Sequence, residues 1–234
     1  MSYFNKKAVN ATLIKQVLKS PMQAWHEYNN PFQGNDAMNF GSLVHAIVLG
    51  VGLEDFAKSP KFDRRTKEGK ANAEEFARLN EGKIAIDETT WLEAQLCAQS
   101  VTQSHPAMSL LNKATNREKE YSFKIGEIDC KSKIDADGDG FVLDLKTTSN
   151  IQGFREIITE YHYHTQLAFY GMALGNVKNY YLIAVSTKAP YECVVYNINS
   201  TIYEGKKNVE KALGYADMIV RGIEFGNSEE IITL

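Results

Sequence analysis

The sequence has few cysteines and no long apolar runs, which are the features typical of secreted, zinc-ribbon and membrane proteins. Only three of its 234 residues are cysteines, and none forms a Cys-x-x-Cys pair. We therefore expect neither a disulfide framework nor a zinc ribbon, and a reducing compartment is favoured. The most apolar window, residues 43–53, is too short to span a bilayer and contains His45. No apolar run follows the first seven residues, so we expect no secretory signal, no membrane partner and a cytoplasmic protein.

An excess of charge of one sign is also missing. The net charge is −3, with 44% hydrophobic and 24% charged residues, as in ordinary globular proteins. Any binding of nucleic acid must therefore rest on a local basic patch or on bound cations. We predict one domain over 1–234, with a mainly helical part at 1–115 and a sheet with helices at 116–225.

Apolar periodicity predicts helices on both sides of a central group of strands. Helices are predicted at 12–19, 20–28, 39–49, 71–80, 88–104, 151–161, 165–174 and 202–222. Strands are predicted at 83–86, 120–125, 128–136, 141–147, 180–185 and 192–198. Residues 58–70 are polar and basic, which favours an exposed loop. This order predicts an α/β (α+β) fold with a central mixed β-sheet flanked by helices.

What the sequence does have is a hairpin that carries acids and a lysine. Asp135 lies nine residues before Asp144, and Lys146 follows Asp144 by two positions. Alternation along a strand puts Asp144 and Lys146 on one face, while Asp135 lies on the partner strand and Glu120 begins the strand before it. Converging carboxylates suit Mg²⁺ or Mn²⁺. Such a site favours phosphodiester cleavage, in which Lys146 would orient the attacking water or offset charge on the phosphate.

The same residues also suggest a calcium-binding loop. Asp135, Asp137, Asp139 and Gly140 fit positions 1, 3, 5 and 6 of an EF-hand loop. However, Lys146 stands at position 12, where a bidentate Glu belongs, and the flanks read as strands. We therefore interpret Asp137 and Asp139 as turn residues. A non-catalytic calcium- or DNA-binding module is the alternative from a different functional class.

Two further groups of polar residues have both a functional and a plain interpretation. Gln166 and Tyr170 are four apart, so on a helix they form a polar pair that could hold a phosphate or a metal-bound water. Spacing alone favours a tyrosine-rich helix that simply packs on the sheet. His45 lies in an apolar helix, where a hydrogen-bonded core histidine is the commoner case.

In their order along the chain, these residues resemble the PD-(D/E)XK nuclease superfamily. Within it, the chain is similar to the RecE-type exonucleases (exonuclease VIII catalytic domain) of phages and prophages, which implies a restriction-endonuclease-like core. The matching segments are 41–45 (GSLVH), 62–67 (FDRRTK), 144–148 (DLKTT) and 163–170 (YHTQLAFY).

The resemblance assigns roles to the hairpin residues. It makes Asp135 and Asp144 the main metal ligands, adds the Leu145 carbonyl as a further ligand, and makes Lys146 the catalytic lysine. The family often has Arg or Pro around the first acid, whereas Lys133-Ile134 precede Asp135 here. An arginine contact at that point is therefore not expected.

The resemblance also assigns roles outside the hairpin. Glu120 matches the acid of the preceding strand, with Glu118 as the neighbouring alternative. His45 matches the motif histidine near a second metal. Gln166 and Tyr170 match two residues of the family's helix that supports the site and the end of the substrate.

The activity implied is Mg²⁺-dependent digestion, with Mn²⁺ as a substitute metal, of one strand from double-stranded DNA ends. Digestion would run 5′ to 3′ and leave 3′ tails for recombination beside a single-strand annealing protein in the bacterial host.

A ring-shaped homo-oligomer, trimer or tetramer, is implied, and its channel could be lined by Arg64, Arg65, Lys67 and Lys70. The plain alternative for these four is a solvated loop. A nuclease of the superfamily with another polarity or substrate is the alternative enzyme, although three scattered cysteines argue against its iron–sulfur branch, which carries four.

Overall fold

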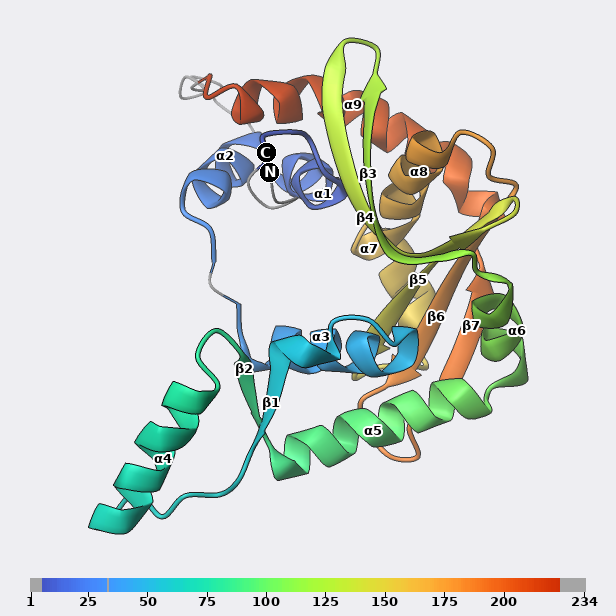
Figure 1. The fold of residues 1–234 in the computed structure, drawn as a ribbon. Coiled ribbons are helices and arrows are strands. Elements are labelled where there is room, and N and C mark those ends of the chain that lie inside the picture. The colour runs from blue at the N-terminus through green and yellow to red at the C-terminus, as the bar shows by residue number, and fades with distance from the viewer. Residues whose placement is uncertain (1–5, 33, 224–234) are drawn as a thin grey trace, which may run out of the picture.

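A five-stranded sheet forms the centre of the computed structural model, which describes residues 6–32 and 34–223 (Figure 1). Its strands lie in the order β3-β4-β5-β6-β7. Their bounds are Asn116–Ile125 for β3, Ile128–Gly138 for β4, Phe141–Thr148 for β5, Asn179–Ser186 for β6 and Cys193–Asn197 for β7. β5 and β6 are parallel and the other neighbours are antiparallel. The predicted mixed sheet is confirmed.

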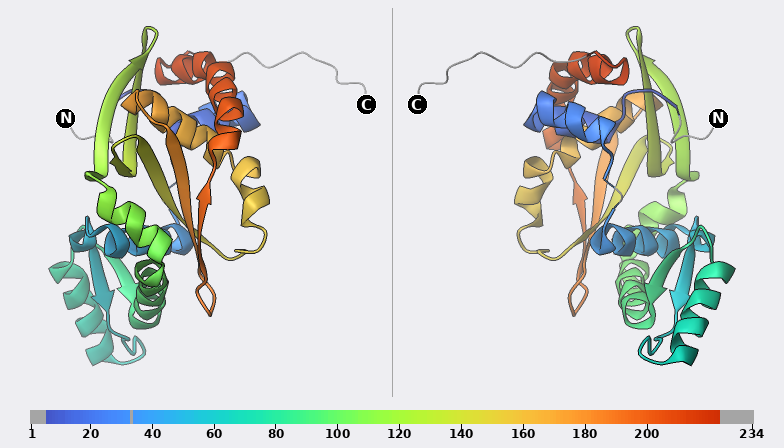
Figure 2. Two further views of the ribbon diagram at one scale, coloured as in Figure 1. Left: turned by 90° about the vertical axis from the view of Figure 1, so that its right-hand side faces the viewer. Right: turned by 90° about the vertical axis from the view of Figure 1, so that its left-hand side faces the viewer.

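Helices cover both faces of this sheet (Figure 2). The helices are α1 Ala11–Lys19, α2 Pro21–Asn29, α3 Asp36–Leu49, α4 Lys67–Leu79, α5 Glu88–Gln103, α6 His105–Lys113, α7 Phe154–Glu160, α8 Tyr163–Leu174 and α9 Ile202–Val220. One hydrophobic core joins the sheet to α1, α2, α7, α8 and α9. A second core joins the opposite face to α3, α5 and α6. The chain thus builds a helix–sheet–helix sandwich with two cores.

The middle strand β5 divides the two cores. Val142 belongs to the first core, whereas Leu143 and Leu145 belong to the second, as alternation along a strand requires. All three side chains are fully buried, and so is Asp144, which lies between the two leucines. An acid in a strand that is buried on both faces needs polar partners to offset its desolvation.

An arm formed by β1, α4 and β2 projects from this body (Figure 1). β1 (Phe56–Ser59) and β2 (Ile84–Asp87) pair in parallel, with α4 as the crossover. The prediction of a loop over 58–70 is therefore wrong at its ends, because β1 reaches Ser59 and α4 starts at Lys67. The Thr66 side chain caps α4 by accepting the N–H of Gly69 at 2.9 Å.

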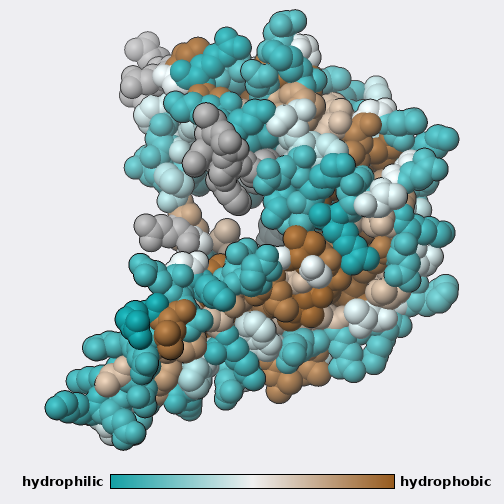
Figure 3. Space-filling view, in the orientation of Figure 1, coloured by the Kyte–Doolittle hydropathy of each residue, from teal (hydrophilic) through white to brown (hydrophobic). Residues whose placement is uncertain are grey.

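The surface is largely hydrophilic on the face seen in Figure 3, with a hydrophobic area below a hollow that separates α1 and α2 from α3. Within the described ranges, no helix combines the length and the apolar character that crossing a membrane requires.

Close packing of α8 against α9 gives a stability test. A Cβ at Gly205 of α9 would lie 2.5 Å from the carbonyl oxygen of His164, whereas a Cβ at Gly214 of the same helix meets nothing within 4 Å. We expect Gly205→Ala to lower the free energy of unfolding by about 1–3 kcal/mol through overpacking. Gly214→Ala should raise it by about 0.5–1 kcal/mol, since alanine favours helices. Urea denaturation of both variants measures this; equal effects would contradict the packing described.

Candidate metal and catalytic site

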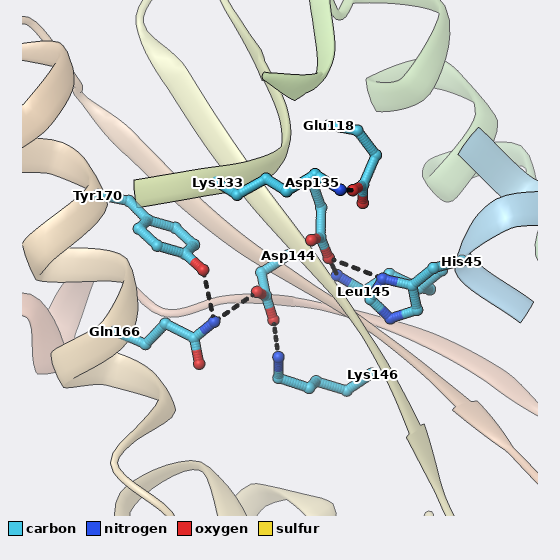
Figure 4. Close-up of polar contacts among 9 residues, drawn as sticks. All are labelled: His45, Glu118, Lys133, Asp135, Asp144, Leu145, Lys146, Gln166 and Tyr170. Carbon is cyan, nitrogen blue, oxygen red and sulfur yellow. Dashed lines mark hydrogen bonds and ion pairs between the residues drawn. The ribbon is translucent and has the colours of Figure 1, made fainter. Parts of the chain in front are cut away.

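The site forms where β4 and β5 separate. The two strands are paired only next to their turn, and Ala136 with Leu143 is the last pair. If the pairing continued in the same register, Asp135 would lie opposite Asp144, but the strands no longer pair at that position. The two carboxylates therefore lie close together in the gap between the strands (Figure 4).

Asp135 is held by backbone and imidazole groups. Its Oδ2 accepts the N–H of Leu145 at 2.8 Å and lies 3.4 Å from His45 Nδ1. The residue is only 8% exposed. The pKa of Asp135 is raised to about 6: burial is the largest cause and the charge of Asp144 adds to it, while His45, Lys146 and the Leu145 N–H act in the opposite direction. A cation bound at this carboxylate would offset the cost of ionising it.

Glu118 completes a set of possible metal ligands. His45, Glu118 and Asp135 each offer one ligand atom, and these atoms lie within 4.8 Å of one another. Glu118 has φ +50°, a left-handed conformation that is uncommon outside glycine and that here occurs near the start of β3. An ion pair with Lys133 holds its carboxylate. One imidazole nitrogen and two carboxylates, mostly shielded from water, suit Mn²⁺ or Mg²⁺.

The structure brings Glu118, and not Glu120, to this cluster. Glu120 is exposed and lies opposite Lys133 in the β3–β4 register. The signal that favours Glu118 is the two-residue turn between Ile125 and Ile128. Counting back along the two strands from that pair places Glu118 opposite Asp135. The assignment of Glu120 as the site acid is corrected on this geometry.

Asp144 is the centre of a second, connected network. Its Oδ2 lies 2.6 Å from Lys146 Nζ, and its Oδ1 accepts Gln166 Nε2 at 2.8 Å. Gln166 Nε2 also donates to the hydroxyl of Tyr170 at 2.7 Å, so the two α8 residues share a face as their spacing predicts. Both lie buried against the sheet. The helix therefore packs on the sheet and also contacts the acid (Figure 4). That its polar pair holds a phosphate or a metal-bound water stays a prediction.

Lys146 is held as a cation. Burial alone would lower its pKa, but the carboxylates of Asp144 and Asp135 outweigh burial and raise the pKa. The ammonium also lies over the Tyr163 ring, 5.0 Å from its centroid. Lys146 can therefore donate hydrogen bonds to a water or a phosphate oxygen, whereas a general base would have to be neutral.

Lys15 of α1 is a residue of this network that sequence reasoning missed. Its Nζ donates to Gln166 Oε1 at 2.8 Å, which fixes the orientation of the amide that holds Asp144. Burial, followed by repulsion from Lys146, lowers its pKa to about 8. No local signal marks Lys15, because it reaches the site only through packing of α1 against α8.

The remaining predicted residues lie elsewhere. Asp139 is exposed in the β4–β5 turn, as interpreted, but Asp137 is buried on β4 and is not a turn residue. Its carboxylate accepts Asn116 Nδ2 at 2.8 Å and the Tyr121 hydroxyl at 2.6 Å, which argues against a calcium loop.

The four basic residues proposed to contact DNA lie in the projecting arm, before and in the first turn of α4 (Figure 1). Arg64, Arg65, Lys67 and Lys70 are all exposed, and Arg65 pairs with Asp63 at 3.0 Å. Their role stays a prediction. The three cysteines are free and lie on α5, β4 and β7, so they form no cluster.

Comparison with known proteins agrees with this architecture. The chain matches the family described as "PDDEXK-like domain of unknown function (DUF3799)" over residues 10–230. It resembles the crystal structure of a "Putative exonuclease" from Eubacterium rectale with a TM-score of 0.68 and 12% identity, over 96% of this chain and 88% of the other. That likeness shows the fold.

A "phage related exonuclease" from Haemophilus somnus 129PT aligns with a TM-score of 0.38 and 15% identity, over 77% of this chain and 95% of the other. No curated protein gives a significant sequence match. The family match confirms the predicted PD-(D/E)XK type of domain.

The two acids of β3 provide a matched test of metal binding. We expect Glu118→Gln to weaken Mn²⁺ binding at least about tenfold, because it removes one of three converging ligands. Glu120→Gln makes the same change two residues away and should leave the affinity unchanged. Calorimetric titration of both variants with MnCl₂ measures this; the reverse ranking would restore Glu120 as the ligand.

The raised pKa of Asp135 predicts how the stability of the metal-free protein depends on pH. Since the folded-state pKa of about 6 exceeds the ordinary value of 3.8, ionisation costs stability as the pH rises from 3.8 to 6, and the full cost is present above 6. We expect Asp135→Asn in EDTA to raise the free energy of unfolding at pH 8 by up to about 3 kcal/mol. The gain should shrink as the pH falls through 6. Urea denaturation at pH 8 and 5 tests this, and a pH-independent effect would contradict it.

Proposed function

Because this chain belongs to the PDDEXK-like domain family, we propose that it is a divalent-metal-dependent nuclease that digests duplex DNA from its ends. The observation that carries this proposal is the gap between β4 and β5. There His45, Glu118 and Asp135 offer metal ligands beside the ion pair of Asp144 and Lys146. Buried acids of this kind destabilise a fold unless they are paired or bind a cation, so their concentration in one place indicates a site.

The donor set fits a divalent ion. His45, Glu118 and Asp135 would hold it, with Asp144 beside them. The N–H of Leu145 points toward Asp135, and in a strand the carbonyl of the same residue points to the same edge, which supports Leu145 as a further ligand. Bound there, the ion would supply Lewis-acid polarisation of the phosphodiester and a more acidic water.

The protein groups around that position have separate tasks. Lys146 donates to the attacking water or to a non-bridging phosphate oxygen, where negative charge grows during displacement. Asp144 fixes the ammonium at 2.6 Å, and Gln166 fixes Asp144. Lys15 fixes Gln166 in turn, so a chain of four side chains from α1, α8 and β5 positions the reacting lysine.

The finer parts of the proposal rest on the resemblance to RecE-type exonucleases. They are 5′ to 3′ polarity, the production of 3′ single-stranded tails, Mg²⁺ as the metal with Mn²⁺ as a substitute, a ring-shaped trimer or tetramer, and a single-strand annealing protein as partner in phage-type recombination. A ring would also reconcile the net charge of −3 with DNA binding, because basic residues of several subunits could face one channel. The basic residues of the arm supply such a patch.

Digestion of blunt duplex DNA labelled separately at the 5′ and 3′ ends tests this proposal. We expect Mg²⁺-dependent release of the 5′ label, none in EDTA, and no cutting of a covalently closed circle. Lys146→Met should lower the rate about 10²–10⁴-fold, since the cation no longer stabilises the transition state. Lys188→Met, at an exposed turn lysine, is the matched control. Full activity of Lys146→Met, or cutting of the circle, would overturn the exonuclease assignment.

A further inference from the structure

The first residue of α8, Tyr163, lies next to the catalytic lysine but has no task in the reaction proposed above. On this helix Tyr163, Gln166 and Tyr170 follow one another at spacings of three and four residues, so they share a face. The Gln166 amide on that face donates to Asp144 and to the Tyr170 hydroxyl. The ring of Tyr163 therefore belongs to the same group of polar and charged side chains.

Two lysine side chains meet at the Tyr163 ring. The Nζ of Lys146 lies 5.0 Å from the ring centroid, and the Nζ of Lys15 lies 5.5 Å from it. Both distances fit a cation–π interaction, in which the negative face of an aromatic ring attracts an ammonium group. One ring is thus shared by a lysine of β5 and a lysine of α1.

The two ammonium groups repel each other in a partly buried place. Asp144 pairs with Lys146 at 2.6 Å, whereas Lys15 donates to the neutral Oε1 of Gln166 at 2.8 Å. Burial, followed by repulsion from Lys146, lowers the pKa of Lys15. The face of the Tyr163 ring adds negative potential where the two positive charges approach each other.

The ring itself is fixed by the first hydrophobic core. It stacks on Phe154 of α7, with 5.9 Å between the two centroids and 28° between the planes. Tyr161 contacts it edge-on, with centroids 6.1 Å apart and planes at 75°. Phe154 is fully buried in that core. Since its aromatic neighbours hold the ring, the ring can restrain the long and flexible lysine side chains.

The backbone before Tyr163 directs the ring toward the network. His162, the N-cap residue of α8, has φ +55°, a left-handed conformation that is uncommon for residues other than glycine. Its N–H donates to the carbonyl of Thr159 at 3.1 Å, and its carbonyl accepts the N–H of Gln166 at 3.0 Å. Such a conformation persists where the surrounding structure determines the direction of the chain.

We propose that Tyr163 is a positioning residue, whose ring holds the ammonium groups of Lys146 and Lys15 in the places that phosphodiester cleavage requires. Through Lys146, the ring orients the cation that acts on the water or the phosphate oxygen. Through Lys15, it orients Gln166 and thereby Asp144. The aromatic ring is required and its hydroxyl is not. The inference rests on the proposed function for the task of Lys146, but the restraint of the two lysines does not depend on it.

The kinetics of duplex digestion by matched variants test this inference. Tyr163→Leu should lower kcat about 3- to 30-fold with KM unchanged, as expected when one cation–π attraction is lost in the transition state. Tyr163→Phe keeps the ring, so it should digest DNA at the wild-type rate. The control is Tyr196→Leu, because the Tyr196 ring of β7 also packs on Phe154, at 5.5 Å. It should keep the wild-type kcat.

A fluorinated ring separates electrostatics from packing. Pentafluorophenylalanine at position 163 has nearly the shape of Phe, but its fluorine atoms withdraw electrons and remove the negative potential of the ring face. This variant leaves no cavity, so it should fold as Tyr163→Phe does. We expect its kcat to fall as far as that of Tyr163→Leu.

NMR relaxation of the lysine ¹³Cε nuclei in EDTA tests the restraint without any cleavage. The signals of Lys15 and Lys146 are assigned by their loss in Lys15→Met and Lys146→Met. Both side chains should be rigid on the ps–ns timescale in the wild type, in Tyr163→Phe and in Tyr196→Leu. Their order parameters should fall in Tyr163→Leu and in the fluorinated variant.

Three results would overturn the inference. They are a wild-type kcat in the fluorinated variant, equal losses in Tyr163→Leu and Tyr163→Phe, and lysine order parameters that stay the same in every variant at position 163. If the wild type itself does not digest DNA, the proposed function fails. In that case the order parameters still decide, because mobile lysines in Tyr163→Leu but not in Tyr196→Leu keep Tyr163 as the residue that positions them.

Discussion

The separation of β4 from β5 beyond Ala136 and Leu143 is the constraint on which the site depends. Paired strands would direct the Leu145 N–H to a partner carbonyl, but here it donates to the carboxylate of Asp135. The gap places two acids side by side in a nearly dry environment, where their charges are costly unless cations are present. Lys146 offsets part of this cost, and a bound metal would offset more.

Elements from both faces of the sheet complete the site. α3 supplies His45 from one core, and its close approach to β5 is visible at Gly41, where a Cβ would lie 3.3 Å from Thr147 Oγ1. α8 supplies Gln166 from the other core, and α1 adds Lys15. The two hydrophobic cores thus determine distances between polar groups that share no local sequence. Small repacking on either face would disturb the alignment of Asp144 with Lys146.

How much of the structure the sequence alone can predict depends on how far apart in the sequence the interacting residues lie. The Asp-Gly turn and the alternation of β5 are local, so the hairpin acids and Lys146 could be found from their spacing. Glu118 required the β3–β4 register, and its left-handed φ breaks the regular strand pattern. Lys15 depends on the packing of helices that are distant in sequence. In the arm, the helix at 71–80 and the strand at 83–86 were predicted, but β1 was missed, because it is four residues long and its partner β2 lies beyond the crossover helix α4.

The most direct test of the central claim is the position of a bound metal. Crystals grown with Mn²⁺ and measured for anomalous scattering would locate the ion without reference to activity. We predict an anomalous peak in the gap between β4 and β5, coordinated by His45, Glu118 and Asp135 and next to Asp144. A peak at the exposed Asp139 turn, or none at millimolar Mn²⁺, would contradict the account.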